Sequence, residues 1–154
     1  MFKKIVVFLV IPLMLAAFVA QAAPLQATCS GGGCNGLNPH TTGCDQSTTT
    51  WESRSISNGH IELRFSWICE TLWARTRNEN GWHYAQSTLA YYMFWDSYNY
   101  PWYHTNSRAP IAPGRSVYTP MRYDPVPDPY WNACGSLTNY YIGGAVLWPC
   151  TSRQ

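Results

Sequence analysis

The side chains in this sequence that could carry acid–base or metal chemistry are four histidines and eight carboxylates. The histidines are His40, His60, His83 and His104. They form no His-Glu-x2-His motif or other close metal-ligand pair, and no serine lies in a Gly-x-Ser-x-Gly elbow. The best single carboxylate is Asp96, since the aromatic Phe94 and Trp95 beside it would raise its pKa. The alternative is that Asp96 pairs with an arginine at a strand end, and we assign no catalytic residue.

Six cysteines form the second set of reactive side chains. They are Cys29, Cys34, Cys44, Cys69, Cys134 and Cys150. An even number of cysteines in an exported chain predicts disulfides, so we expect no free thiol nucleophile. The simplest pairing joins Cys134 to Cys150, because these two lie apart from the other four. The other four then pair among themselves, and we favour an N-terminal arm that is joined to the sheet through Cys69.

Zinc is the rival interpretation of these cysteines. Structural zinc sites favour cysteine pairs two to four residues apart, and Cys29-x4-Cys34 fits this spacing loosely, with His40 nearby. No second close pair exists in the sequence, and export favours oxidation of the thiols. We therefore expect disulfides, no metal and no cofactor.

Aromatic side chains could bind a ligand rather than react with it, and they make up 16% of the chain. The predicted ligand-binding residues are Trp82, Trp95, Tyr100, Trp102, Tyr103 and His104. Residues 98–104 are predicted to be a loop, where rings have less to bury against. Exposed Trp and Tyr beside Asn suit the flat apolar faces and hydroxyl rims of sugars, and they also suit protein interfaces. The alternative is that these rings only pack over one end of the fold.

The charge balance excludes nucleic acid as a partner. Only 12% of the residues are charged, and the two lysines, Lys3 and Lys4, lie in a segment that we expect to be removed. Residues 23–154 then hold eight arginines against eight acidic residues, which gives a net charge of zero. A nucleic-acid-binding protein, like a polybasic membrane binder, normally carries a net basic surface.

Residues 1–23 are predicted to be a cleaved secretory signal peptide. A short basic head precedes an apolar run over residues 5–20, and Ala20-Gln21-Ala22 supplies a small-x-small cleavage pattern. The run is short for a membrane span, although an uncleaved anchor is the alternative. We therefore expect residues 24–154 to be one secreted domain without a transmembrane anchor.

Alternating apolar residues predict an all-β domain. Residues 48–57 and 59–68 should form a hairpin around Asn58-Gly59, with Leu63, Phe65 and Trp67 inward and Glu62 and Arg64 on an exposed face. Trp73 should fill the core, and Arg64 and Arg75 could clamp a carboxylate. Residues 87–97 are apolar on both faces, which indicates a central or covered strand. A strand over 116–121 and a last strand over 139–149 complete a small β-barrel or β-sandwich with Pro/Gly-rich loops, stapled by disulfides.

Three ordered motifs carry a family resemblance. They are Cys29-x4-Cys34-Asn35-Gly36-x-Asn38-Pro39-x3-Gly43-Cys44, Ile61-Glu62-Leu63-Arg64-Phe65-Ser66-x2-Cys69-x3-Trp73-Ala74-Arg75, and Tyr118-Thr119-Pro120-Met121. Together they resemble the YjfA-like family of exported bacterial proteins, a domain of unknown function with the family number 2690, from about Cys29 to Cys134. The resemblance implies secretion from bacteria of the Gram-positive type and no assigned activity. Family members often have aspartates at positions 35 and 38, so the asparagines here lack the charge that a cation site would need.

The combined expectation is a secreted, monomeric, non-catalytic binding or interaction module. Its expected partner is a cell-wall glycan or an extracellular protein, which it would recognise through exposed aromatic side chains. The alternatives are a small secreted hydrolase that uses Asp96 or Glu62 with a histidine, and a secreted toxin or inhibitor.

Overall fold

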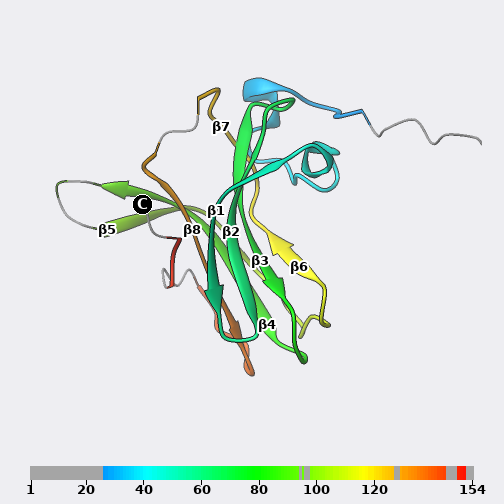
Figure 1. The fold of residues 1–154 in the computed structure, drawn as a ribbon, viewed down its shortest axis with the longest axis vertical. Coiled ribbons are helices and arrows are strands. Elements are labelled where there is room, and N and C mark those ends of the chain that lie inside the picture. Colours follow the sequence, from blue (N-terminus) through cyan, green and yellow to red (C-terminus); the bar gives the residue numbers. More distant parts are fainter. Residues whose placement is uncertain (1–25, 94, 96–97, 127–128, 145–148, 152–154) are drawn as a thin grey trace, which may run out of the picture.

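The fold is known from a computed structural model that describes residues 26–93, 95, 98–126, 129–144 and 149–151 (Figure 1). Strands dominate these residues, and the two helical segments are short 3-10 turns. The elements are η1 (Gly31–Cys34), η2 (Cys44–Gln46), β1 (Thr49–Ile56), β2 (Gly59–Ser66), β3 (Thr71–Asn78), β4 (Tyr84–Met93), β5 (Tyr98–Asn106), β6 (Ser116–Tyr118), β7 (Arg122–Tyr123) and β8 (Trp131–Thr138). None of the described segments is a helix that is long and apolar enough to cross a membrane.

Two antiparallel sheets make up the domain. The first has the order β1-β2-β3-β6, with β7 also paired to β3, and the second has the order β5-β4-β8. Neither sheet closes on itself, so the fold is a sandwich and the barrel option is wrong. β4 is the central strand of the second sheet, as its two apolar faces predict.

The core between the sheets is built by period-two alternation. Its buried residues are Ile61, Leu63, Phe65, Leu72, Ala74, Leu89, Trp131 and Ala133. Alternation does not extend past the end of β2, so Trp67 lies beyond the strand and is 60% exposed, which corrects its predicted inward position. Trp67 instead meets the Phe65 ring edge-on, with 4.6 Å between the ring centroids.

The two sheets lie close together at one end of the sandwich. A Cβ atom on Gly135 of β8 would lie 2.1 Å from Thr76 Oγ1 of β3, and one on Gly59 would lie 2.8 Å from Leu137 Cδ1 of β8. Large side chains such as Phe65 and Trp131 fill the opposite end. At this opposite end, the β4–β5 hairpin diverges from β1–β3 and extends beyond them (Figure 1). Among the described residues, no strand of the first sheet covers one face of this hairpin.

The predicted hairpin between β1 and β2 is present, but its turn lies one residue earlier. Ile56 pairs with Gly59, so the two loop residues are Ser57 and Asn58. Asn58 takes the left-handed conformation with a φ of 68°, which asparagine tolerates better than most residues. Gly59 belongs to the strand, where a Cβ atom would lie 2.0 Å from the carbonyl oxygen of Arg77. Glycine is needed there for close packing rather than for the turn.

Two predictions about the C-terminal half are wrong. Residues 98–104 lie in strand β5 rather than in a loop. Of the predicted strand over 139–149, residues 145–148 lie outside the described residues and 139–144 form no strand; the last strand among the described residues is β8, which the sequence did not indicate. The alternation in β8 is hard to detect because Ala133 and Gly135 are its inward residues next to Trp131. Small side chains are required where the two sheets lie close together.

The six cysteines form three disulfides, Cys29–Cys34, Cys44–Cys69 and Cys134–Cys150. The local C-terminal pair and the attachment of the arm through Cys69 are thereby confirmed. The arm, residues 26–48, packs on the outer face of the first sheet over Trp73, which is fully buried as predicted. Backbone hydrogen bonds from Gly36 N to Met121 O (2.9 Å) and from Met121 N to Leu37 O (2.8 Å) add to this attachment.

Candidate functional site

The uncovered face of the β4–β5 hairpin carries a group of aromatic side chains. Tyr91 of β4 pairs with Tyr100 on one side and with Trp131 of β8 on the other. Directly paired residues point to the same face of a sheet. Because Leu89, two residues before Tyr91, belongs to the core, this face continues the core side of the sheet beyond the first sheet.

A β-bulge places Trp102 in the same group. Leu89 pairs with Tyr103 and Ala90 pairs with Pro101, so Trp102 is the extra residue of β5. Such a bulge bends the strand and redirects a side chain. Pro101 has no N–H, and it is tolerated because β5 is an edge strand.

Contacts beneath and beside Trp102 hold its ring in place. The Trp102 and Trp131 rings meet edge-on, with centroids 5.6 Å apart, and Trp131 meets Tyr91 in the same way at 5.0 Å. The Arg122 guanidinium lies 4.5 Å from the centroid of the Trp102 ring. The indole Nε1 of Trp131 donates a hydrogen bond of 3.0 Å to Asp124 Oδ2. Trp131 is buried and thus forms a rigid support.

Exposed rings lie above this support. We define the aromatic face as Tyr98, Tyr100 and Trp102 of β5, which are exposed, together with the supporting residues Tyr91 and Trp131. Trp102 is 49% exposed and Tyr98 is 70% exposed. At the tip of the hairpin, a cavity of about 200 Å³ is lined by Tyr91, Tyr92, Met93, Trp95 and Tyr130. Rings backed by a fixed support suit the binding of a flat apolar surface.

The six predicted ligand-binding residues do not all meet at this face. Tyr100 and Trp102 lie on it, and Trp95 lines the cavity at the hairpin tip. Tyr103 packs against the core. Trp82 precedes β4 whereas Trp95 follows it, so the ten residues of β4 separate them by about 30 Å.

His104 points away from the aromatic face. It pairs with Thr88, and its Nδ1 lies 2.7 Å from Thr88 Oγ1. Burial lowers the pKa of His104, which disfavours the charged form of the ring. The C-terminal segment crosses this side of the sheet, where Gln86 and Asn106 both donate to the Ile142 carbonyl. His104 therefore does not belong to the same site as Trp102.

Sequence reasoning missed three contributors to this site. Trp131, Tyr130 and Arg122 reach it from the segment around β7 and β8, at least 16 positions after β5. The adjacent Tyr130-Trp131 after a proline-rich run was the available signal, but only the pairing of β8 with β4 brings it to the aromatic face.

A charged cluster on the outer face of the first sheet is the second candidate. Glu62 is 6% exposed, which corrects its predicted exposure. Its Oε2 lies 2.5 Å from Arg75 Nη2 and 3.1 Å from Arg64 Nη1, so the two arginines do clamp a carboxylate. Burial raises the pKa of Glu62, but the hydrogen bond to Arg75 and the nearby positive charges outweigh burial, and the net pKa is lowered.

The histidine in this cluster is not arranged for catalysis. His60 Nε2 lies 2.8 Å from Glu62 Oε1, and His60 Nδ1 lies 3.0 Å from Glu79 Oε1. Both ring nitrogens are therefore engaged by carboxylates, and neither is available to take a proton from a substrate. Asp96, the other predicted carboxylate, lies outside the described residues. The arrangement of the cluster is that of a structural ion-pair network.

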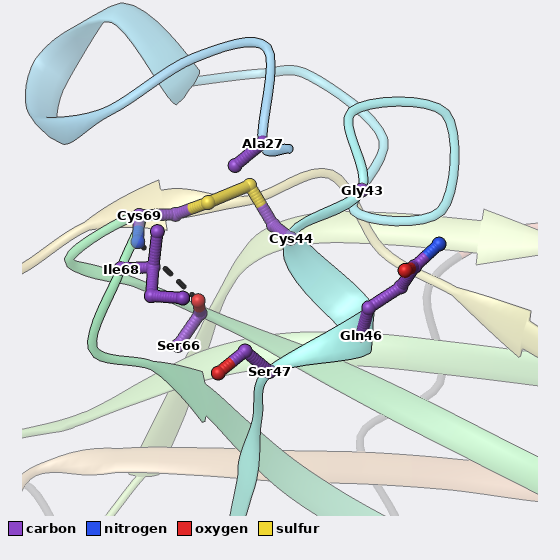
Figure 2. A pocket seen from close by; sticks show the side chains of 8 residues that line it. All are labelled: Ala27, Gly43, Cys44, Gln46, Ser47, Ser66, Ile68 and Cys69. Carbon is purple, nitrogen blue, oxygen red and sulfur yellow. Dashed lines mark hydrogen bonds between the residues drawn. A yellow bond between two sulfur atoms is a disulfide. The ribbon is translucent and has the colours of Figure 1, made fainter. Parts of the chain in front are cut away.

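A cavity beside the Cys44–Cys69 disulfide is the third candidate (Figure 2). It has a volume of about 270 Å³, and its lining includes Ala27, Gln46, Ser66, Ile68 and both cysteines. Ser66 Oγ accepts a hydrogen bond of 3.3 Å from the Cys69 backbone N–H. Among the described residues, no titratable side chain lines the cavity, so we assign it no acid–base chemistry.

The two asparagines of the arm hold the backbone. Asn35 Oδ1 accepts a hydrogen bond of 2.7 Å from Tyr123 N, and Asn38 Oδ1 accepts one of 2.8 Å from His40 N. These amide oxygens shape the loops of the arm.

Comparison with known proteins gives a match to a protein-family model. The model of a family described as "Protein of unknown function (DUF2690)" matches residues 32–134, which is more than half of the chain. The matched segment begins within η1 and ends within β8, so it includes most of the arm, the charged cluster and the whole aromatic face. No curated protein and no solved structure matches this chain.

Proposed function

Since the chain belongs to the DUF2690 family of proteins of unknown function, we propose its function from the geometry of the aromatic face. In this proposal the protein is a secreted bacterial binding module without catalytic activity, and it binds a cell-wall glycan. Disulfides and the absence of a membrane-spanning helix among the described residues are compatible with an extracellular location. The basic, apolar N-terminal segment of the sequence supports export as well.

The observation that carries this proposal is the row of exposed rings on β5. From Tyr98 to Trp102 the strand spans about 13 Å, which is longer than one sugar ring. The C–H faces of successive sugars in a chain could therefore lie on successive aromatic side chains.

The rigid support under the rings also favours binding. Trp102 is held by Trp131 and Arg122 before any ligand arrives. Side chains that are already ordered lose little conformational entropy on binding, so more of the contact energy appears as affinity. The zero formal charge of residues 23–154 provides no long-range attraction for polyanions, which favours a neutral glycan.

An extracellular protein is the second candidate partner. The stacking of Arg122 on Trp102, with tyrosines around it, is the residue combination that concentrates binding energy at protein interfaces. Competition with soluble oligosaccharides from the cell wall separates the two partners, because only glycan binding is displaced by them.

The test compares two exposed tryptophans, Trp102 on the aromatic face and Trp82, which precedes β4. We expect purified protein to be retained on isolated cell walls, and Trp102→Ala to weaken retention at least about tenfold, which corresponds to about 1.4 kcal/mol. Trp82→Ala is the matched control, since Trp82 is also exposed but lies away from the aromatic face. Retention should be measured as a binding isotherm for all three proteins.

Either of two results would contradict the proposal. One is the absence of retention of the unsubstituted protein. The other is equal retention of the Trp102→Ala and Trp82→Ala variants. Circular dichroism of each variant ensures that a loss of binding is not a loss of fold.

A further inference from the structure

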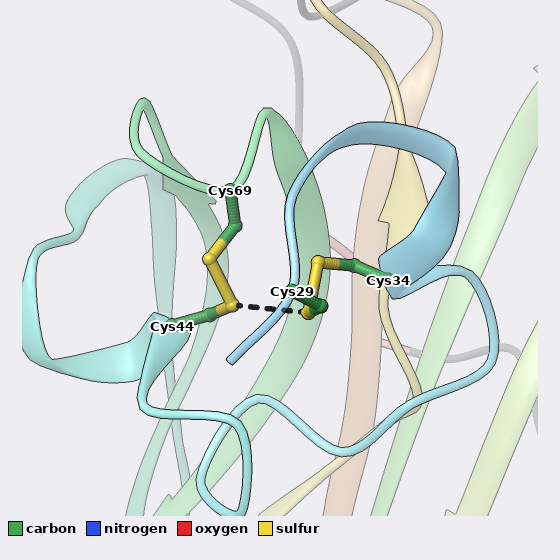
Figure 3. Close-up of side chains that lie close together, drawn as sticks. All are labelled: Cys29, Cys34, Cys44 and Cys69. Atoms are coloured by element: carbon green, nitrogen blue, oxygen red, sulfur yellow. Dashed lines mark hydrogen bonds between the residues drawn. A yellow bond between two sulfur atoms is a disulfide. The ribbon is translucent and has the colours of Figure 1, made fainter. Parts of the chain in front are cut away.

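Four cysteine sulfurs gather where the arm meets the first sheet (Figure 3). The Sγ atoms of Cys29, Cys34, Cys44 and Cys69 all lie within 4.8 Å of one another. Cys29 Sγ and Cys44 Sγ, which belong to different disulfides, are 3.8 Å apart. Neither of these sulfurs carries a proton, so this is a van der Waals contact between the two disulfides. The fold therefore places Cys44 and Cys69, which are far apart in sequence, beside the Cys29–Cys34 pair.

The spacing of these sulfurs suits a tetrahedral metal. Zinc binds thiolate at about 2.3 Å, so the sulfurs of a tetrahedral four-thiolate site lie about 3.8 Å apart. The contact between Cys29 and Cys44 already has this length. After reduction, the sulfurs within each former disulfide would move apart and the remaining distances would shorten by about 1 Å or less. Side-chain rotation can supply movements of this size.

The surroundings of the cluster also suit a structural metal site. Cys34, Cys44 and Cys69 are buried, and they pack with Trp73 and Met121. Such an apolar shell excludes water from thiolate ligands. Entry is nonetheless open, because Cys44 and Cys69 line the cavity of Figure 2 and Cys29 lines a second cavity of about 340 Å³ beside Ile68.

We propose that, in the reduced protein, these four cysteines form a site for one zinc ion. The oxidised chain holds the arm through two disulfides, and the reduced chain holds it through the metal. A phosphine reductant supplies two electrons to each disulfide and becomes the phosphine oxide with the oxygen atom of one water molecule, whose two protons complete the two thiols. Zinc binding then releases the four thiol protons and forms four zinc–sulfur bonds, which leaves a site with a net charge of −2. This site is independent of the aromatic face.

Cobalt provides a spectroscopic probe of the site. The full-length protein is reduced with a water-soluble phosphine under anaerobic conditions and titrated with Co²⁺. We expect one Co²⁺ per chain, with thiolate-to-cobalt charge-transfer and tetrahedral d–d absorption bands that are abolished when Zn²⁺ is added. The oxidised protein should show neither set of bands.

Two double variants give the test its specificity. Cys134→Ser/Cys150→Ser removes the distant disulfide and should leave the cobalt spectrum and stoichiometry unchanged. Cys44→Ser/Cys69→Ser removes two ligands and should abolish the four-thiolate bands. If the reduced chain is unfolded without metal, one equivalent of Zn²⁺ should restore its β-sheet circular dichroism.

The proposal is overturned by an absence of these bands in the reduced protein, or by bands that persist in Cys44→Ser/Cys69→Ser. Neither result would bear on glycan binding, which the Trp102→Ala comparison tests separately.

Discussion

Replacing Gly135 by alanine is expected to lower the free energy of unfolding by at least about 3 kcal/mol, because no space exists for a methyl group there. The added Cβ would lie 2.1 Å from Thr76 Oγ1 and 2.6 Å from the Gln86 carbonyl oxygen. Thr76 belongs to the opposite sheet and Gln86 to the neighbouring strand, so the methyl group must push both apart. Urea unfolding followed by tryptophan fluorescence measures the loss.

Gly33→Ala is the matched control for this prediction. A Cβ atom on Gly33 meets no atom within 4 Å, and we expect its free energy of unfolding to change by less than about 0.5 kcal/mol. Equal stability of Gly135→Ala and Gly33→Ala would show that the sheets do not approach each other as closely as described.

Glu62→Gln is expected to cost about 3 kcal/mol of stability, the second largest effect. The substitution leaves Arg64 and Arg75, whose side chains are 15% and 18% exposed, without their shared carboxylate. A buried charge that loses its partner keeps its desolvation cost and loses the compensating attraction. Chemical unfolding at neutral pH measures the difference from the unsubstituted protein.

Glu79→Gln is the control at the same histidine. Glu79 contacts His60 from the other side, but its side chain is 50% exposed. Exposed ion pairs contribute less than about 1 kcal/mol. If Glu62→Gln cost no more than Glu79→Gln, the network around Glu62 would not be a stabilising feature.

The pH dependence follows from the same network. The pKa of Glu62 is lowered in the folded state, so its contribution is fully present above the ordinary pKa of 4.5. It is lost as the pH falls through the lower folded pKa, because the unfolded chain takes up the proton first. Stability of the unsubstituted protein should therefore decline below pH 4.5 more steeply than that of Glu62→Gln. Parallel declines would argue against this assignment.

Local patterns allowed parts of the fold to be predicted. The β1–β2 hairpin follows from Thr-rich and β-branched residues before an Asn-Gly pair and alternation after it, and a central β4 follows from its two apolar faces. Cys134 and Cys150 are close in sequence and far from the other four cysteines, so their pairing was the simplest choice. Each of these inferences depends on neighbours within about 20 residues.

The errors occur where distant segments decide the outcome. Glu62 alternates like an exposed residue, but Arg75 across the strand pair and Arg64 beside it cover its carboxylate. Residues 98–104 contain a proline and a bulge, so their sequence resembles that of a loop. Only the pairing with β4 shows that they form a strand. β8 was missed because its inward residues include Ala133 and Gly135, which do not look like core residues in the sequence. Their small size is explained by the first sheet, which lies directly against Gly135.

The sequence by itself determined the all-β class, the disulfide chemistry and the surplus of aromatic side chains, because composition and period-two alternation are properties of the chain. Tertiary structure alone decided which rings share a surface and which sulfurs share a cluster. Tyr100, Trp102 and Trp131 meet because strand pairing and a bulge turn them to one face. Trp82 and His104 are excluded by strand length and by the alternation of side chains across the sheet.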